Sequence, residues 1–134
     1  MLEQGGTDKA SELRIAVTPY FNLAATMTFL DPFRAANYLE GMALFRWKIV
    51  SETGGVVTAS NGIEINSTPF SEADMNMANM LVVSSSWEPE RHASPALRTE
   101  LRNAERRQAI LGGIDTGAFI LAHAGLLAGY TATV

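Results

Sequence analysis

The residues best placed to do chemistry are Gly113 to Gly117, which lie between an expected strand and an expected helix. Two glycines flank Asp115 at the spacing of a nucleophile elbow, the tight turn that presents one side chain at the carboxyl end of a strand. Such an elbow normally carries serine or cysteine, and a carboxylate is a poor nucleophile for acyl transfer. An ordinary hydrolase is therefore disfavoured. The alternative is a plain tight loop in which Asp115 caps the following helix.

The elements around this turn alternate between strand and helix. Proline after a capping residue predicts helices that begin at Asp31-Pro32 and at Ser94-Pro95, the first running to about Glu40 before Gly41. A third helix is expected over 117–124. Short apolar or alternating runs predict strands at 13–17, 45–50, 80–83 and 109–114. This order predicts an α/β fold with a mostly parallel sheet covered on both faces.

Two smaller features are expected between the second and third of these strands. Ser60-Asn61-Gly62 separates residues 56–59 from residues 63–65, and Asn-Gly between β-rich segments predicts a small β-hairpin. Residues 71–76 are expected to form one helical turn. In the Ser94-Pro95 helix, Leu97, Leu101 and Ala104 recur at helical spacing, so this helix should bury one face.

Composition limits the possible functions. A chain of 134 residues with 47% hydrophobic content can bury one core. A net charge of −4 argues against direct binding to a phosphate backbone. The chain has no cysteine, which excludes disulfides, thiolate zinc sites and cysteine nucleophiles. No apolar run reaches the ~18–20 residues that span a bilayer, so we expect a soluble cytoplasmic protein. The polar residues 1–12 are expected to be a flexible leader, and residues 13–134 the folded domain.

The segment from Gly113 to Thr133 resembles AraC-type transcriptional regulators whose amino-terminal domain is PfpI-like, because it shares their Gly-Ala-Phe, Leu-Ala, Ala-Gly-Leu-Leu and Ala-Thr positions. Phe29 to Asn37 is similar to the first helix of that family, and Val57 to Gly62 to its hairpin. The resemblance implies the three-layer, flavodoxin-like sandwich of the class I glutamine-amidotransferase-like fold. It also implies an effector-sensing and dimerising domain, with a homodimer as the expected assembly.

Two departures from the enzymes of this superfamily bear on activity. Asp115 stands where those enzymes carry cysteine, and the loop from Thr18 to Asn22 has no glutamate to partner it. The resemblance therefore implies a non-catalytic domain without a cofactor. It also implies that the domain continues past Val134 and that DNA is bound only through a C-terminal helix-turn-helix domain absent from this chain. The alternatives are a PfpI-like enzyme of the hydratase or amidase kind that works without cysteine, and a stand-alone binding protein.

The candidate ligand site lies where strands end, because open α/β sheets bind ligands outside the carboxyl ends of their strands. A carboxylate near an indole suits an organic cation through charge and cation–π contact, and relatives in the family include regulators of carnitine, betaine and arginine catabolism. We therefore expect a small amine, quaternary ammonium or guanidino effector. The expected ligand-binding residues are Thr18, Phe21, Ser86, Trp87, Asp115 and Thr116, with Pro19 and Ser85 beside them.

Several of these residues also have structural interpretations. Trp87 could belong to the core or to a dimer interface, and backbone N–H groups at a helix start could satisfy Asp115. Glu88, Glu90 and His92 could line a metal, but so short a charged stretch favours a solvated turn, and no metal is expected. His123 is interpreted as structural.

Overall fold

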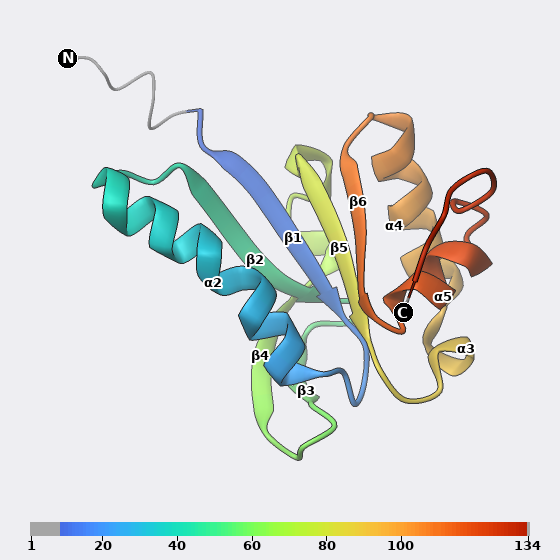
Figure 1. Ribbon diagram of the computed structural model, residues 1–134. Coiled ribbons are helices and arrows are strands. Elements are labelled where there is room, and N and C mark those ends of the chain that lie inside the picture. The colour runs from blue at the N-terminus through green and yellow to red at the C-terminus, as the bar shows by residue number, and fades with distance from the viewer. Residues whose placement is uncertain (1–8, 134) are drawn as a thin grey trace.

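The computed structural model describes residues 9–133, which form a six-stranded sheet between two helical layers (Figure 1). The strands lie in the order β3-β4-β2-β1-β5-β6. All neighbours are parallel except β3 and β4, which form the expected hairpin. The strands are β1 (Ser11–Val17), β2 (Phe45–Ser51), β3 (Gly55–Thr58), β4 (Glu64–Pro69), β5 (Met80–Ser85) and β6 (Ile110–Asp115). The expected three-layer fold with a mostly parallel sheet is confirmed.

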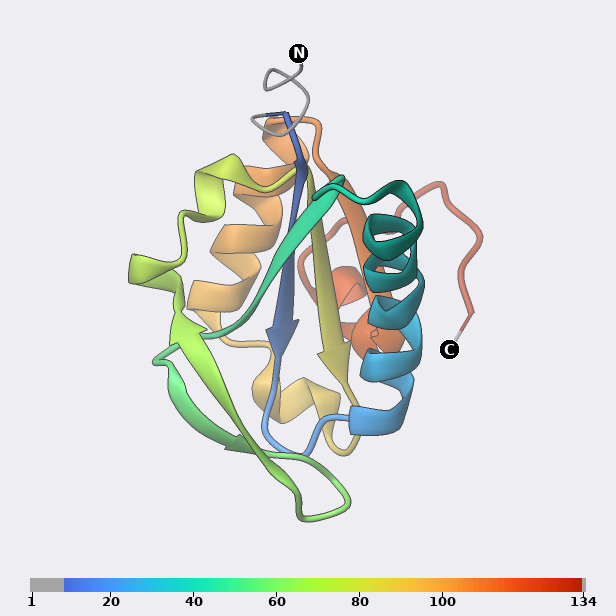
Figure 2. The same cartoon turned by 90° about the vertical axis from the view of Figure 1, so that its left-hand side faces the viewer.

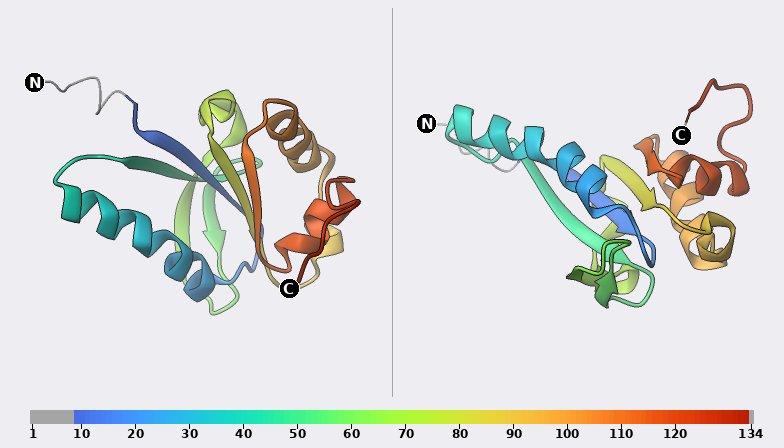
Figure 3. Two further views of the ribbon diagram at one scale, coloured as in Figure 1. Left: turned by 45° about the horizontal axis from the view of Figure 1, so that its top comes forward. Right: turned by 60° about the horizontal axis from the view of Figure 1, so that its bottom comes forward.

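The helices divide unequally between the two faces of the sheet (Figures 2 and 3). Helix α2 (Leu23–Glu40) covers one face by itself. The other face carries α3 (Pro89–His92), α4 (Pro95–Arg106) and α5 (Gly117–His123). Two short 3-10 turns, η1 (Phe70–Glu72) and η2 (Met75–Met77), replace the single helical turn expected over 71–76. Helix α3 was not expected from the sequence.

Two clusters of buried side chains fill the two sides of the sheet. Neighbouring residues of β1 alternate between them, as strand geometry requires: Ile15 and Val17 pack toward α2, and Ala16 packs toward α4 and α5. Helix α4 supplies Leu97, Leu101 and Ala104 to the second cluster, as its spacing predicts. The α2 cluster comprises Ile15, Val17, Phe21, Val57 and Ala59.

Helix α2 begins at Leu23, well before the predicted start at Asp31-Pro32, so that prediction was wrong. Asn22 is the N-cap, and its side-chain oxygen accepts a hydrogen bond from the Ala25 N–H at 3.0 Å. Pro32 therefore lies inside the helix, where it removes one backbone hydrogen bond. The predicted end is confirmed, because Gly41 adopts a left-handed φ of 68° and closes the helix.

Strand β1 begins two residues before the predicted Leu13. Ser11 and Glu12, which were assigned to a flexible leader, pair instead with Phe45 and Arg46 of β2. The rest of the predicted leader includes residues 1–8, which lie outside the described residues. Within residues 9–133, no helix combines the length and the apolar character needed to cross a membrane.

One charged side chain, that of Arg14 in β1, lies inside the fold with only 1% of its surface exposed. Its Nε donates to the carbonyl of Ala73 at 2.7 Å. Its Nη1 donates to Glu12 Oε1 at 2.9 Å and to the Leu13 carbonyl at 3.1 Å. Arg14 thereby ties β1 to the segment between η1 and η2.

Candidate functional site

The turn from β6 into α5 has the geometry of a nucleophile elbow. Strand β6 ends at Asp115, whose φ of 56° is left-handed, and α5 begins at Gly117. A Cβ on Gly117 would lie 2.2 Å from the Val83 carbonyl oxygen, and a Cβ on Gly113 would lie 2.8 Å from the Ala118 nitrogen. Both flanking positions therefore require glycine, because backbone atoms of β5 and α5 occupy the space that a side chain would need.

The Asp115 carboxylate is hydrogen-bonded to Asn22, the residue that caps α2. The Asn22 side-chain amide donates to Asp115 Oδ2 at 3.1 Å. Helix α5 has Thr116 as its N-cap residue and no side-chain hydrogen bond at that cap, so the interpretation of Asp115 as the cap of α5 was wrong. Since Asn22 is also the cap of α2, a single side chain connects the elbow carboxylate to the start of the helix on the opposite face.

Each of the two serine hydroxyl groups at the end of β5 is hydrogen-bonded to a threonine hydroxyl from another segment. Thr18 Oγ1 donates to Ser85 Oγ at 3.0 Å, and the hydroxyls of Thr26 and Ser84 lie 2.7 Å apart. All four residues are buried. Each serine of β5 therefore meets a threonine hydroxyl, which is a poor base, and not a carboxylate or an imidazole that could activate it.

The predicted ligand-binding residues separate into groups. Thr18, Ser86, Asp115 and Thr116 come together at the carboxyl ends of β1, β5 and β6, where Thr116 Oγ1 donates to the Ser86 carbonyl at 2.7 Å. Phe21 is fully buried in the α2 cluster, so its ring is not available to a ligand while that core is closed. Trp87 lies at the surface with 67% of its area exposed. Trp87 is therefore not a core residue.

A cavity of about 550 Å³ opens at the ends of β1 and β2, where the loop after β2 and residues of α3 both line it. Figure 2 shows α3 and the β3–β4 hairpin at that end of the sheet. Among the predicted site residues, only Thr18 and its neighbour Pro19 line this cavity. The lining residues are Val17, Thr18, Pro19, Tyr20, Ser51, Glu52, Thr53, Gly54, Val56, Val57, Thr58, Phe70, Arg91, His92, Ser94 and Leu97.

Sequence reasoning missed the charged residues of this cavity. Glu52 follows β2, whereas Arg91 and His92 belong to α3, and nothing in their spacing predicts that they meet. The one available signal was the charged stretch from Glu88 to His92, which was considered as a metal site. In the structure Glu88 Oε1 pairs with Arg91 Nη1 at 2.7 Å. Across residues 9–133 no three His, Asp or Glu side chains gather as metal ligands would.

A second hollow of about 440 Å³ lies beside η2 and α4 and is lined in part by Asp74 and Glu100. Burial raises the pKa of Glu100 above its ordinary value of 4.5, although Arg107 opposes the shift. A raised folded-state pKa means that the carboxyl group contributes stability below pH 4.5 and that this stability is lost as pH rises through the folded-state pKa. The ionised Glu100 therefore destabilises the fold at neutral pH.

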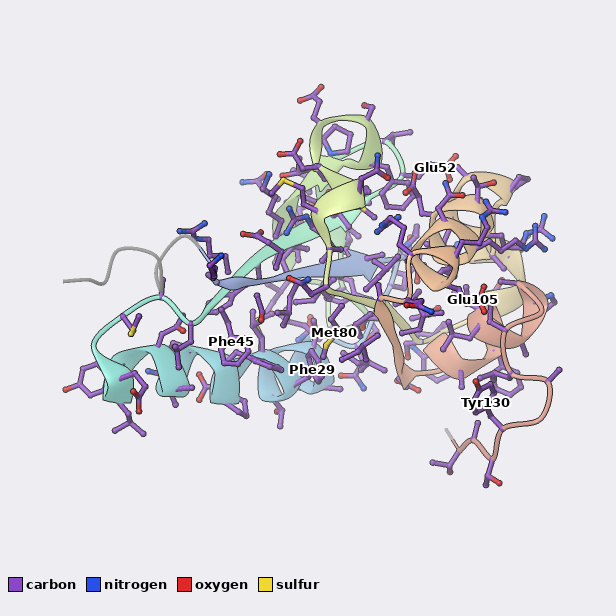
Figure 4. All side chains as sticks on the ribbon, turned by 90° about the horizontal axis from the view of Figure 1, so that it is seen from above. Phe29, Phe45, Glu52, Met80, Glu105 and Tyr130 are labelled. Atoms are coloured by element: carbon purple, nitrogen blue, oxygen red, sulfur yellow. The ribbon has the colours of Figure 1, made fainter. Side chains whose placement is uncertain are left out.

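Glu100→Gln is accordingly expected to raise the melting temperature at neutral pH and to leave it nearly unchanged below pH 4.5. The gain should be at most about 1 kcal/mol, because solvent screens this partly exposed group. Thermal unfolding by circular dichroism at the two pH values measures it. Glu105→Gln, an exposed change on the same helix (labelled in Figure 4), is the control. An equal gain at both pH values would contradict this account of Glu100.

The chain is similar in sequence to helix-turn-helix regulators. It is 40% identical over 116 residues to the HTH-type transcriptional regulator CdhR of Pseudomonas aeruginosa, an alignment that covers 87% of this chain and 34% of that protein. The chain thus spans about a third of the length of the curated relatives it matches. No protein-family model matches the sequence.

Solved structures extend the likeness to the fold. An AraC family transcriptional regulator from Pseudomonas putida superposes with a TM-score of 0.78 and 26% identity, over 90% of this chain and 64% of that one. A ThiJ/PfpI domain protein from Brachyspira murdochii superposes with a TM-score of 0.70 and 20% identity, over 87% and 65% of the two chains. This chain is therefore a homologue of one region of HTH-type, AraC-like transcriptional regulators, and its fold is that of the ThiJ/PfpI domains.

Proposed function

We propose that this chain is the non-catalytic, effector-sensing part of a transcriptional regulator. The observation that carries this proposal is the elbow, which keeps its left-handed backbone but presents Asp115, a carboxylate held by Asn22. The hydroxyls of Ser84 and Ser85 support the same conclusion, because each is hydrogen-bonded to a threonine hydroxyl and not to a base. The curated relatives are named as regulators. We propose that DNA is bound through a separate helix-turn-helix domain and that the regulator is a homodimer.

The effector proposed for the elbow is an organic cation, such as a small amine, a quaternary ammonium or a guanidino compound. Asp115 supplies the opposite charge, and Thr18, Ser86 and Thr116 supply polar atoms at the same edge of the sheet. The exposed indole of Trp87 follows Ser86 directly and offers a face for cation–π contact. Phe21, which was expected to join them, is enclosed in the core and is left out of the proposed site.

Ligand binding at this site can be coupled to α2 through the Asn22 side chain. A cation at Asp115 competes with the Asn22 amide for the carboxylate, and the same Asn22 side chain caps the first turn of α2. A ligand shifts a conformational equilibrium only when it interacts differently with the two states. The competition for Asp115 provides that difference, and α2 is the element that responds to it.

The test is a thermal-shift panel of alkylamines, tetraalkylammonium ions and alkylguanidines on three proteins: wild type, Asp115→Asn and Asp74→Asn. A ligand at a hundred times its Kd stabilises by ~2.7 kcal/mol. Wild type should show such a shift with at least one cation, and Asp115→Asn should lose it. Asparagine keeps the shape of Asp115, tolerates its left-handed φ and can still accept from Asn22, so only the charge is removed.

Asp74→Asn is the matched control, because Asp74 also has a left-handed φ, of 49°, and its carboxylate pairs with the partly exposed Lys48 at 3.6 Å. This variant should respond to the cation as wild type does. A shift that is equal in wild type and Asp115→Asn would remove Asp115 from the site. The absence of a shift with every cation would overturn the cationic effector.

A further inference from the structure

Helix α2 is an apolar helix that is covered on one side only. Asp31, Arg34 and Glu40 are the only charged residues among its 18 positions, yet Thr26 is its only buried residue. Within residues 9–133 no other element lies over its outer side (Figures 1 and 3). A helix that is apolar around most of its circumference is normally buried against a second surface. The outer side of α2 is therefore suited to contact with another molecule.

Four exposed side chains form one stripe along α2, and they are Met27, Asp31, Arg34 and Tyr38. Successive members lie four, three and four residues apart, which places them on the same face of a helix. Tyr38 is 80% exposed and Met27 is 39% exposed. The side chains of Asp31 and Arg34 are both more than half exposed. The stripe is symmetric about its midpoint, with two opposite charges inside and two apolar side chains outside.

A stripe with this symmetry fits a second copy of itself. When two copies of a helix lie antiparallel around a two-fold axis, residues equidistant from the axis face one another, and each contact occurs twice. With the axis midway between Asp31 and Arg34, the Asp31 of each copy faces the partner's Arg34. Met27 then faces the partner's Tyr38, and a thioether against an aromatic ring is a favourable contact. Each side chain of the stripe thus meets one of matching chemistry.

The ion pair already present on α2 is compatible with this arrangement. Arg34 Nε donates to Asp31 Oδ1 at 2.8 Å, and so exposed a pair is weak. A carboxylate accepts several hydrogen bonds and a guanidinium donates several, so each can contact its neighbour and the partner's opposite charge together. Parallel helices would instead bring Asp31 against the partner's Asp31. The charges therefore favour the antiparallel arrangement.

We propose that two copies of this chain associate through antiparallel α2 helices, with Asp31 paired to the partner's Arg34 and Met27 packed on the partner's Tyr38. This inference rests on the homodimer proposed above and names its contact surface. A contact through one pair of helices is small, so the dimer is expected to be weak and to dissociate on dilution. Because Asn22 both caps α2 and binds Asp115, the elbow is connected to one end of this contact.

Charge reversal tests the contact, and sedimentation equilibrium of the whole chain over a range of concentrations measures it. Asp31→Arg would face the partner's Arg34 with a like charge, and Arg34→Asp would face the partner's Asp31 in the same way. Each variant alone should dimerise about tenfold to a hundredfold more weakly than wild type. An equimolar mixture of the two variants should dimerise about as tightly as wild type, because one copy then carries both positive charges and the other both negative charges. A folding defect in either variant could not produce that recovery.

Two matched controls accompany these variants. Arg91→Glu reverses an arginine that forms the same kind of exposed pair with Glu88, three positions earlier, and it should dimerise as wild type does. Tyr38→Ala should weaken the dimer by removing the aromatic contact. Leu39→Ala should leave the dimer unchanged, because Leu39 is just as exposed, at 79%, but lies about 100° away from Tyr38 around the helix.

Two results would overturn this contact, and they differ in what they mean for the homodimer. If both reversed variants dimerise as tightly as wild type, or if their mixture stays as weak as its components, the α2 contact is wrong and the homodimer stands. If wild type is monomeric at every concentration, both are wrong. The cation panel on Asp115→Asn tests the sensing function separately from either result.

Discussion

Gly117→Ala is expected to lower the free energy of unfolding by about 3 kcal/mol, a large fraction of the ~5–15 kcal/mol by which a domain is stable. The added methyl group would lie 2.2 Å from the Val83 carbonyl oxygen, and both partners are backbone. Relief requires α5 to move away from β5, which opens the cluster that contains Leu121 and Val83. Urea unfolding followed by circular dichroism measures the loss.

Gly112→Ala is the control, because Gly112 lies in β6 close to the elbow but has room for a methyl group. The nearest atom would be Val82 Cγ2, a side-chain atom at 3.3 Å, which needs to move by only a few tenths of an ångström. The free energy of unfolding should stay within about 1 kcal/mol of the wild-type value, because alanine also lowers the conformational entropy of the unfolded chain, which favours folding. Equal unfolding midpoints for the two variants would show that α5 is not packed against β5 as described.

Arg14→Met is expected to lower the free energy of unfolding by about 2–4 kcal/mol, which is the second large effect. Methionine fills much of the space but leaves the Ala73 carbonyl without its donor and the Glu12 carboxylate without its closest partner. The Glu12 side chain is only 15% exposed, so water compensates poorly. The free energy of unfolding in urea gives the magnitude.

Arg34→Met is the control, because it shows how much stability is lost when an exposed arginine is replaced. Arg34 pairs with Asp31 at 2.8 Å, but both side chains are more than half exposed, so the change should stay within about 0.5 kcal/mol. The double variant Arg14→Met with Glu12→Gln should lose less stability than the two single variants together, because it no longer has a Glu12 carboxylate left without its partner. Strictly additive losses would mean that Arg14 does not act through Glu12.

The hydrophobic pattern of the sequence predicted most of the strands, but only one of the two helix starts predicted from a capping residue followed by proline was correct. Ser94-Pro95 begins α4 as predicted, whereas the similar pair Asp31-Pro32 lies within α2. Local sequence cannot separate these cases. The true cap, Asn22, is distinguished by a contact to Asp115, 93 positions away, which no local pattern contains.

In the candidate site, too, the residues positioned by local sequence were predicted, and those positioned by tertiary packing were not. Asp115 and Thr116 follow from the glycine spacing and the strand that precedes it, which are local features. Phe21 occupies the expected loop, yet the left-handed turn at Tyr20 leaves the tyrosine ring outside and Phe21 in the core. The cavity charges at Glu52 and Arg91 depend on how the hairpin and α3 pack, so they could not be read from spacing.

The elbow at Asp115 also gives the protein a natural place for a chemical probe. The sequence contains no cysteine, so Asp115→Cys would introduce the sole thiol of the chain. The turn is held in shape by Gly113 and Gly117, and a cysteine there would carry only about 1–2 kcal/mol of left-handed strain. The rate of alkylation of that sulfur would then report, in real time, how often this one position at the edge of the sheet is covered, without any DNA in the reaction.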